Sequence, residues 1–242
     1  MHIPDGIVPA QVCAAGYGLT GLLTWYSLRQ INKQGNPSAS VPKASLLTAA
    51  FFVASSLYIP IPPSSVHLLL NGLLGTVLGY FAFPAILIGL FFQALIVGHG
   101  GLTTLGVNAV MMGLPALLAY HIFQLRFLSN FIGKRAAAPT RFATGFFAFL
   151  GGALGLAITA LIFMGLVITT IPADFNAQAE QIAVTTLTVS HIPLAILEGT
   201  FTAMLVLFLQ RVKPELLNGP NDGSANRTAK ETTAYQTETA RR

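Results

Sequence analysis

Long apolar runs, almost free of charged residues, make up most of this 242-residue chain. Only 9% of the residues are charged, against about 25% in an ordinary soluble domain, so the chain cannot cover a water-facing surface. Most runs approach the ~20 residues needed to cross a bilayer. We therefore expect an all-α, polytopic membrane helix bundle of about seven transmembrane helices. The runs are approximately 9–28, 44–59, 66–82, 84–98, 105–124, 142–171 and 187–210.

The positions of the cations predict an orientation. The connections "YIPIPPSS", "GHGG" and "IPADFNAQAEQIAV" contain no Lys or Arg. Cytoplasmic loops carry an excess of Lys and Arg, so we expect an outside N-terminus, a cytoplasmic C-terminus and an odd number of spans. The net charge of +5 then reflects topology, and we expect no nucleic-acid partner. The cations that precede the C-terminal tail are Arg29, Lys33, Lys43, Arg126, Lys134, Arg135, Arg141, Arg211 and Lys213.

Composition also divides the chain into two parts. Residues 1–217 form the predicted transmembrane domain, and residues 218–242 are polar without periodicity, which predicts a disordered cytoplasmic tail. No signal-peptide pattern precedes the first apolar run, so we expect Met1 to stay on the mature protein. The single cysteine, Cys13, excludes a disulfide framework.

Histidines are the candidate ligands. With the predicted orientation, His2, His67, His99 and His191 fall in the outer half and His121 near the inner end of its span. A single loop histidine is usually a solvated or capping residue. Four on the side that lacks Lys and Arg favour capture of a cation.

The N-terminus has a further chelating property. A free amine at Met1, the backbone nitrogen of His2 and its imidazole can close fused rings on one metal ion. Nickel and copper can displace the amide proton, whereas Mg²⁺ and Ca²⁺ prefer oxygen ligands. We expect Ser64 or Ser65 to cap the third span and to leave His67 in its first turn as a fourth nitrogen. The alternative is that His2 is an ordinary polar residue at the membrane interface.

Two acidic residues receive structural interpretations. Asp5 lies in "IPDG", a turn signature, and we favour a structural role over direct ligation. Glu198 is the one carboxylate well inside a span. We favour a helix-anchoring hydrogen bond for Glu198, with a relay role as the alternative. His191 is expected in the first turns of the seventh span.

Four segments carry a resemblance: "MHIPDG", "VHLLLNGLLG", "GHGGLTTLGVNAVMMGLPA" and "HIPLAILEG". Over about residues 1–215 the chain resembles the cobalt/nickel substrate-binding components (CbiM/NikM type) of energy-coupling factor transporters. The resemblance implies a seven-helix bundle with a buried N-terminus. It implies a metal held by the Met1 amine, the His2 amide and imidazole, and His67. The "GHGG" loop would line the outer side, and we regard His99, Asp5 and His191 as supporting residues.

The expected function is therefore that of a substrate-capture subunit of an ATP-driven Co²⁺/Ni²⁺ importer in a bacterial or archaeal cell membrane. The resemblance implies a transmembrane coupling subunit, ATP-binding cassette ATPases and a separate small accessory subunit as partners. We expect no bound cofactor and no enzyme activity, because "FIGKRA" is not a P-loop and no H-E-x-x-H motif is present. A standalone secondary carrier or channel is the alternative, which metal flux by the purified protein in liposomes would favour.

Overall fold

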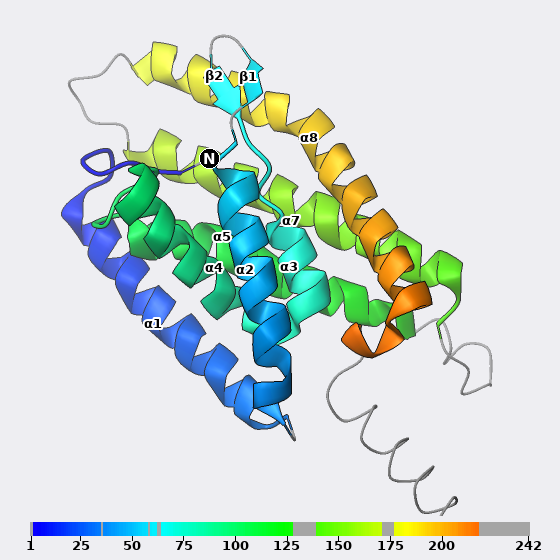
Figure 1. Ribbon diagram of the computed structural model, residues 1–242. Helices are drawn as coiled ribbons and strands as arrows, with labels where there is room; N and C mark the ends of the chain where they lie inside the picture. Colours follow the sequence, from blue (N-terminus) through cyan, green and yellow to red (C-terminus); the bar gives the residue numbers. More distant parts are fainter. Residues whose placement is uncertain are drawn as a thin grey trace, which may run out of the picture.

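The protein is a helical bundle (Figure 1), and the computed structural model describes residues 2–34, 36–57, 59–61, 64–127, 139–170 and 177–217. Met1 and the predicted disordered tail lie outside the described residues. One short hairpin, β1 (Ile59–Ile61) and β2 (Ser64–Val66), accompanies the helices in this part of the chain. The helices are α1 (Ala10–Asn32), α2 (Val41–Ser55), α3 (Asn71–Leu78), α4 (Ala82–Phe92), α5 (Leu105–Gln124), α7 (Arg141–Thr170) and α8 (Ala177–Val212).

Several helical segments have the length and composition of membrane spans. Four such segments are found among the described residues: Asn71–Val97, Leu105–Phe127, Arg141–Thr170 and Gln181–Val212. Large apolar side chains are turned outward, including Trp25 at 59% exposure and Phe142 at 82%. Lipid rather than water suits such a surface, so the chain is a multi-pass membrane protein, as its composition predicted.

The start of the third span differs from the prediction. Ser64 and Ser65 belong to β2 and pair with β1 instead of capping a helix. β2 ends at Val66 and α3 begins only at Asn71, so the expectation that His67 lies in the first turn of a helix is wrong. The prolines at positions 60, 62 and 63 cannot continue a helix, and the β-branched residues around them favour an extended hairpin.

α5 lies at the centre of the bundle, where it packs against α1, α3, α4 and α7. α3 runs along α5 in close contact: Asn71 Nδ2 donates to the Met112 carbonyl, and a Cβ on Gly75 would lie 2.0 Å from the Ala116 oxygen. At Gly79, whose φ is +60°, the chain leaves α3 and continues into α4. The apolar stretch that contains α3 and α4 is therefore interrupted at this glycine.

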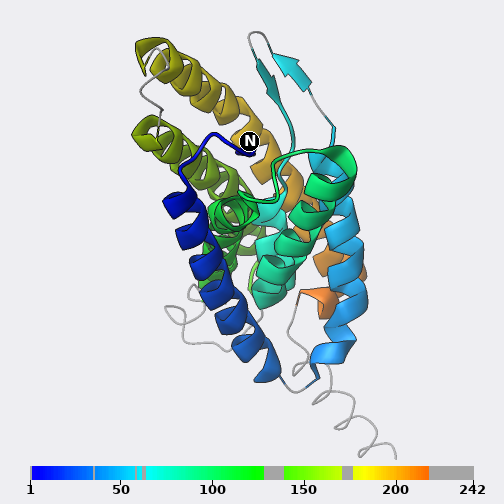
Figure 2. The same ribbon diagram turned by 90° about the vertical axis from the view of Figure 1, so that its left-hand side faces the viewer.

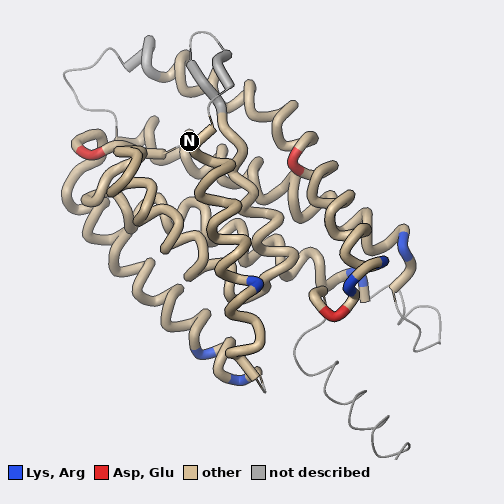
Figure 3. The backbone as a smooth tube through the Cα atoms, in the orientation of Figure 1, with Lys and Arg blue, Asp and Glu red and all other residues tan. Residues whose placement is uncertain are grey.

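The two ends of the bundle differ in charge. The N-terminal segment crosses one end of the bundle (Figure 2), whereas the described Lys and Arg residues gather in the opposite half (Figure 3). There Lys43 Nζ donates to the carbonyls of Val77 and Leu216, at 3.1 and 2.8 Å. Arg126 donates to the carbonyl of Leu217 at 3.4 Å. These bonds attach the last described residues of the chain to the cationic end.

Candidate metal centre

Three histidines from distant parts of the sequence converge at the end of the bundle that the N-terminal segment crosses. His2 precedes α1, His67 lies between β2 and α3, and His99 lies between α4 and α5. One ring nitrogen from each lies within 4.8 Å of the others. The ring centroids are 4.0 Å apart for His2 and His99, 5.0 Å for His2 and His67, and 5.1 Å for His67 and His99. The geometry is compatible with a single ion held by several nitrogens.

The backbone next to His2 is fixed by polar side chains of α5 and of the residue before it. The Ile3 N–H donates to Asn108 Oδ1 at 2.9 Å, and Asn108 Nδ2 donates back to the Ile3 carbonyl at 3.0 Å. The Thr104 hydroxyl donates to the same carbonyl at 2.7 Å. Ile3 itself is fully buried, so the chain immediately after His2 has a defined position.

Asp5 has the structural role that the sequence favoured. Its carboxylate accepts hydrogen bonds from the N–H groups of Thr103 and Thr104, at 3.0 and 3.2 Å, and from the Thr103 hydroxyl at 2.5 Å. The Thr103 hydrogen bond is the main reason why the pKa of Asp5 is lowered. α5 begins at Leu105, so this negative charge also lies at the positive end of a helix dipole.

Glycines allow the loop that carries His99 to approach the N-terminal segment. Gly100 has φ +83°, a backbone conformation that L side chains rarely adopt. A Cβ on Gly101 would lie 1.9 Å from Asp5 Oδ1, so a larger residue at this position would push the two segments apart. The His99 N–H donates to the Gln93 carbonyl at 3.1 Å, which ties the loop to the end of the α4 segment.

Glu198 of α8 holds the segment that carries His67. Its carboxylate accepts the N–H of Leu69 at 2.5 Å and the N–H of Leu70 at 3.1 and 3.2 Å. Leu70 has φ +52°, a left-handed conformation that is strained for a branched side chain. The anchoring hydrogen bond predicted for Glu198 is confirmed, and its target is the backbone beside a candidate ligand.

The remaining two histidines lie outside the cluster. α8 begins at Ala177, so His191 lies well inside the helix and the expectation that it occupies the first turns is wrong. Its Nδ1 donates to the Leu187 carbonyl at 2.7 Å. His121 is exposed near the C-terminal end of α5, beside Tyr80 and Tyr120.

Burial of the three clustered histidines favours their neutral form. They lie outside the spanning helices, yet burial lowers the pKa of His99 to about 4 and that of His67 to about 2. Burial also lowers the pKa of His2 well below 6.5. A metal ion binds the neutral imidazole, so the site presents nitrogen lone pairs without first releasing histidine protons.

Fold and geometry together define a class, the polytopic membrane proteins with a candidate metal site at one end of a helical bundle. Residues 2–216 match the profile of a family described as "CbiM: Cobalt uptake substrate-specific transmembrane region", and the chain belongs to this family.

Known proteins show how wide the similarity is. A putative metal transport protein of Haemophilus influenzae is 32% identical over 221 residues, which cover 90% of this chain and 97% of that protein. A putative cobalt transport protein CbiM of Methanocaldococcus jannaschii is 32% identical, with 90% of each chain covered. A fused nickel transport protein NikMN of Rhodobacter capsulatus is 30% identical and covers 90% of this chain, with 64% of its own length matched. The chain is thus a membrane component of cobalt or nickel transport.

A solved structure supports the fold independently. The crystal structure of a transition metal transporter superposes with a TM-score of 0.68 at 23% sequence identity, and it covers 88% of this chain and 93% of that chain. At this level of identity the likeness is one of fold.

The sequence did not predict Gln93, Thr104 or Asn108, which hold the histidine segments in place. Asn108 was visible as an amide inside an apolar run, where a buried polar group needs a partner. Its partner is a backbone more than 100 residues away, at Ile3, and no local pattern identifies such a pair.

We expect Glu198→Leu to loosen the segment at 67–70, because two buried N–H groups would lose their acceptor at roughly 1–3 kcal/mol each. Hydrogen–deuterium exchange of the Leu69 and Leu70 amides should accelerate roughly tenfold or more. Glu198→Gln keeps one acceptor oxygen and should retain most of the protection. Thr200→Val, on an exposed position of the same helix, is the matched control. Unchanged exchange in Glu198→Leu would contradict the anchoring role.

Proposed function

We propose that the protein is the substrate-capture subunit of an ATP-driven Co²⁺/Ni²⁺ importer and that it binds the ion near the outer face of the cell membrane. The observation that carries the proposal is the convergence of His2, His67 and His99 within 4.8 Å in a member of the CbiM family. Their neutral imidazoles suit a borderline transition-metal cation better than Mg²⁺ or Ca²⁺, which prefer oxygen ligands.

The proposed ligand set contains four nitrogens. Two belong to His2, its amide and its imidazole, and the others are the Met1 amine and an imidazole nitrogen of His67. His99 closes the site on its remaining side, with its ring 4.0 Å from that of His2. The Met1 contribution comes from the family resemblance and from the chelate that an amine at this position forms with His2.

The proposed topology has seven spans, α1 to α5, α7 and α8, with the N-terminus outside and the C-terminus in the cytoplasm of a bacterium or archaeon. It is supported by the described Lys and Arg residues, which gather in the half of the bundle opposite the N-terminal segment (Figure 3). In a Cys13→Ala background, a cysteine at Thr103 should react with an impermeant outside reagent and one at Ser38 should not. The reverse labelling pattern would contradict this orientation.

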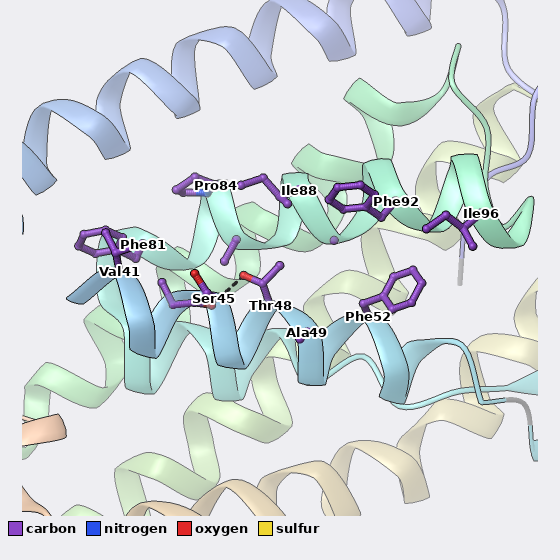
Figure 4. Close-up of a pocket in the computed structure, with 13 residues that line it drawn as sticks. Val41, Ser45, Thr48, Ala49, Phe52, Phe81, Pro84, Ile88, Phe92 and Ile96 are labelled. Atoms are coloured by element: carbon purple, nitrogen blue, oxygen red, sulfur yellow. Dashed lines mark hydrogen bonds between the residues drawn. The ribbon is translucent and has the colours of Figure 1, made fainter. Parts of the chain in front are cut away.

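The resemblance to energy-coupling factor transporters supplies the partners of the proposal: a transmembrane coupling subunit, ATP-binding cassette ATPases and a separate small accessory membrane subunit. An apolar groove of about 490 Å³ between α2 and α4 (Figure 4) offers a surface on which such a membrane helix can pack. Ser45, Thr48 and Ala49 line the α2 side, and Ile88 and Phe92, about half exposed, line the α4 side.

His67→Ala should weaken Ni²⁺ and Co²⁺ binding at least 10–100-fold, because losing one ligand costs no less than losing a residue that orients one. Calorimetric titration of the purified protein measures the change. His121→Ala is the matched control, since His121 is exposed near the other end of α5, and it should bind as the wild type does. Equal affinities for His67→Ala and the wild type would reject the assignment.

The same titrations at pH 6.0 report the protonation of the site. The Met1 amine and the His2 amide should release about two protons per ion, because a free α-amine has a pKa of about 7.7 and an amide must be deprotonated to bind. Histidines with an ordinary pKa of about 6.5 would add roughly three-quarters of a proton each. Because burial lowers the pKa values of the three histidines, we expect them to release no such protons. The metal affinity should therefore fall less steeply with decreasing pH than it would in a site built from ordinary histidines.

A single glycine added before Met1 should abolish metal uptake while expression and membrane insertion stay normal. The addition converts the Met1 amine into an amide and moves the new amine one residue away, but it changes no side chain and no charge. A tag at the C-terminus should have no effect. Uptake at the wild-type rate by the extended protein would show that the terminal amine is not a ligand.

A further inference from the structure

Gln93 lies between the candidate metal site and α2. It is fully buried at the start of a π-helical turn, Gln93–Val97, that follows α4. Its Oε1 is 3.0 Å from His2 Nε2. Its Nε2 donates to the Ser55 hydroxyl oxygen and to the Phe52 carbonyl, the latter at 3.4 Å. Irregular helical turns of this kind are frequent at functional sites.

The hydrogen bonds of α2 determine which way the Gln93 amide faces. The Ser55 hydroxyl donates its single proton to the Phe51 carbonyl at 2.5 Å. Its oxygen can then only accept, and the Phe52 carbonyl also only accepts. Both therefore require the amide nitrogen of Gln93 on the α2 side. The carbonyl oxygen of the same amide is left facing His2.

This orientation determines where His2 carries its proton. A carbonyl oxygen accepts and never donates, so the His2 nitrogen that faces Gln93, Nε2, must be the protonated one. The lone pair then resides on Nδ1. In the described part of the chain, His2 Nδ1 is buried and has no hydrogen-bond partner. Nδ1 is also the ring nitrogen that can close a six-membered chelate with the amide nitrogen of the same residue.

We propose that Gln93 is a positioning residue that selects the Nε2–H tautomer of His2 and so presents Nδ1 to the metal ion. The proposal deepens the proposed function, on which it rests. The same residue accepts the His99 N–H at its backbone carbonyl, at 3.1 Å, so it orients two of the three clustered histidines. Partners of this kind fix the ring orientation and the tautomer of metal-binding histidines.

Loss of the Gln93 carbonyl oxygen should remove the preference of His2 for the Nε2–H tautomer. In Gln93→Leu, the buried Nε2–H has no partner, and the proton becomes free to occupy Nδ1, where an incoming ion must displace it. We expect Ni²⁺ affinity to fall 10–100-fold. Gln93→Glu keeps an acceptor for Nε2–H, and the O–H of its protonated carboxyl can replace the N–H that faces α2, so this variant should retain the Nε2–H tautomer.

The deciding measurement is made without metal. In protein labelled with ¹⁵N-histidine, the His2 ring should show a protonated Nε2 and an unprotonated Nδ1, with the signals assigned by their loss in His2→Asn. Wild type and Gln93→Glu should share this pattern, and Gln93→Leu should lose it. A wild-type His2 that carries its proton on Nδ1 would overturn the proposal, and this result remains decisive even if Gln93→Leu fails to fold.

Ser55→Ala separates the tautomer from packing between α2 and α4. The Phe52 carbonyl still accepts from Gln93 in this variant, so the tautomer and the Ni²⁺ affinity should be retained within about threefold. If Ser55→Ala keeps the Nε2–H tautomer but weakens Ni²⁺ binding as much as Gln93→Leu, helix packing rather than the acceptor is responsible and the proposal fails. The tautomer is observed in the metal-free protein. The role of Gln93 is therefore tested separately from Ni²⁺ binding by the wild type.

Discussion

The pair of hydrogen bonds between the Ile3 backbone and the Asn108 side chain is the interaction on which the candidate site depends. An extended backbone at the end of an apolar bundle has no strand or helix to satisfy its polar groups, and each unsatisfied group is costly in a low-dielectric surrounding. The Asn108 amide provides one acceptor and one donor at the required spacing. These bonds allow Ile3 to be buried in the core, and they fix the position of the neighbouring His2.

Three other buried polar side chains also join separate elements through hydrogen bonds. Asn71 donates to carbonyls on α5 and α7 and to the Thr159 hydroxyl, Glu198 accepts two backbone N–H groups, and Gln93 bridges the N-terminal segment and α2. Each of these residues joins elements that are far apart in the sequence. Apolar contacts alone would leave the helices free to slide, whereas a satisfied polar group fixes their register.

The sequence predicted the helical membrane class because charge density and apolar run length are properties of the whole segment. The chelate at His2 and the motifs shared with a family selected His2 and His67 as ligands and His99 as a supporting residue. The three side chains do lie together, and their binding of a metal stays a prediction. The sequence did not predict that residues 67–70 are non-helical. An apolar run has the same composition whether its N–H groups bond within a helix or to a distant side chain, here the Glu198 carboxylate. The depth of His191 was wrong for a related reason, since α8 continues through polar residues such as Gln181 that appeared to lie in a connection. Gln93 was not predicted, because its proposed role depends on which way its side-chain amide faces, and the sequence does not show this.

Because of the Glu198 hydrogen bonds, the two histidines of the proposed ligand set are attached to different helices. His2 is fastened to α5 and to the α4 segment, whereas His67 is fastened through Leu69 and Leu70 to α8, which packs mainly on α7. α8 itself has few contacts with α4 and α5, so an ion shared by His2 and His67 would directly link the N-terminal segment to the residues that α8 holds. When the ion leaves, this link is lost, whereas the Glu198 hydrogen bonds still tie the His67 segment to α8.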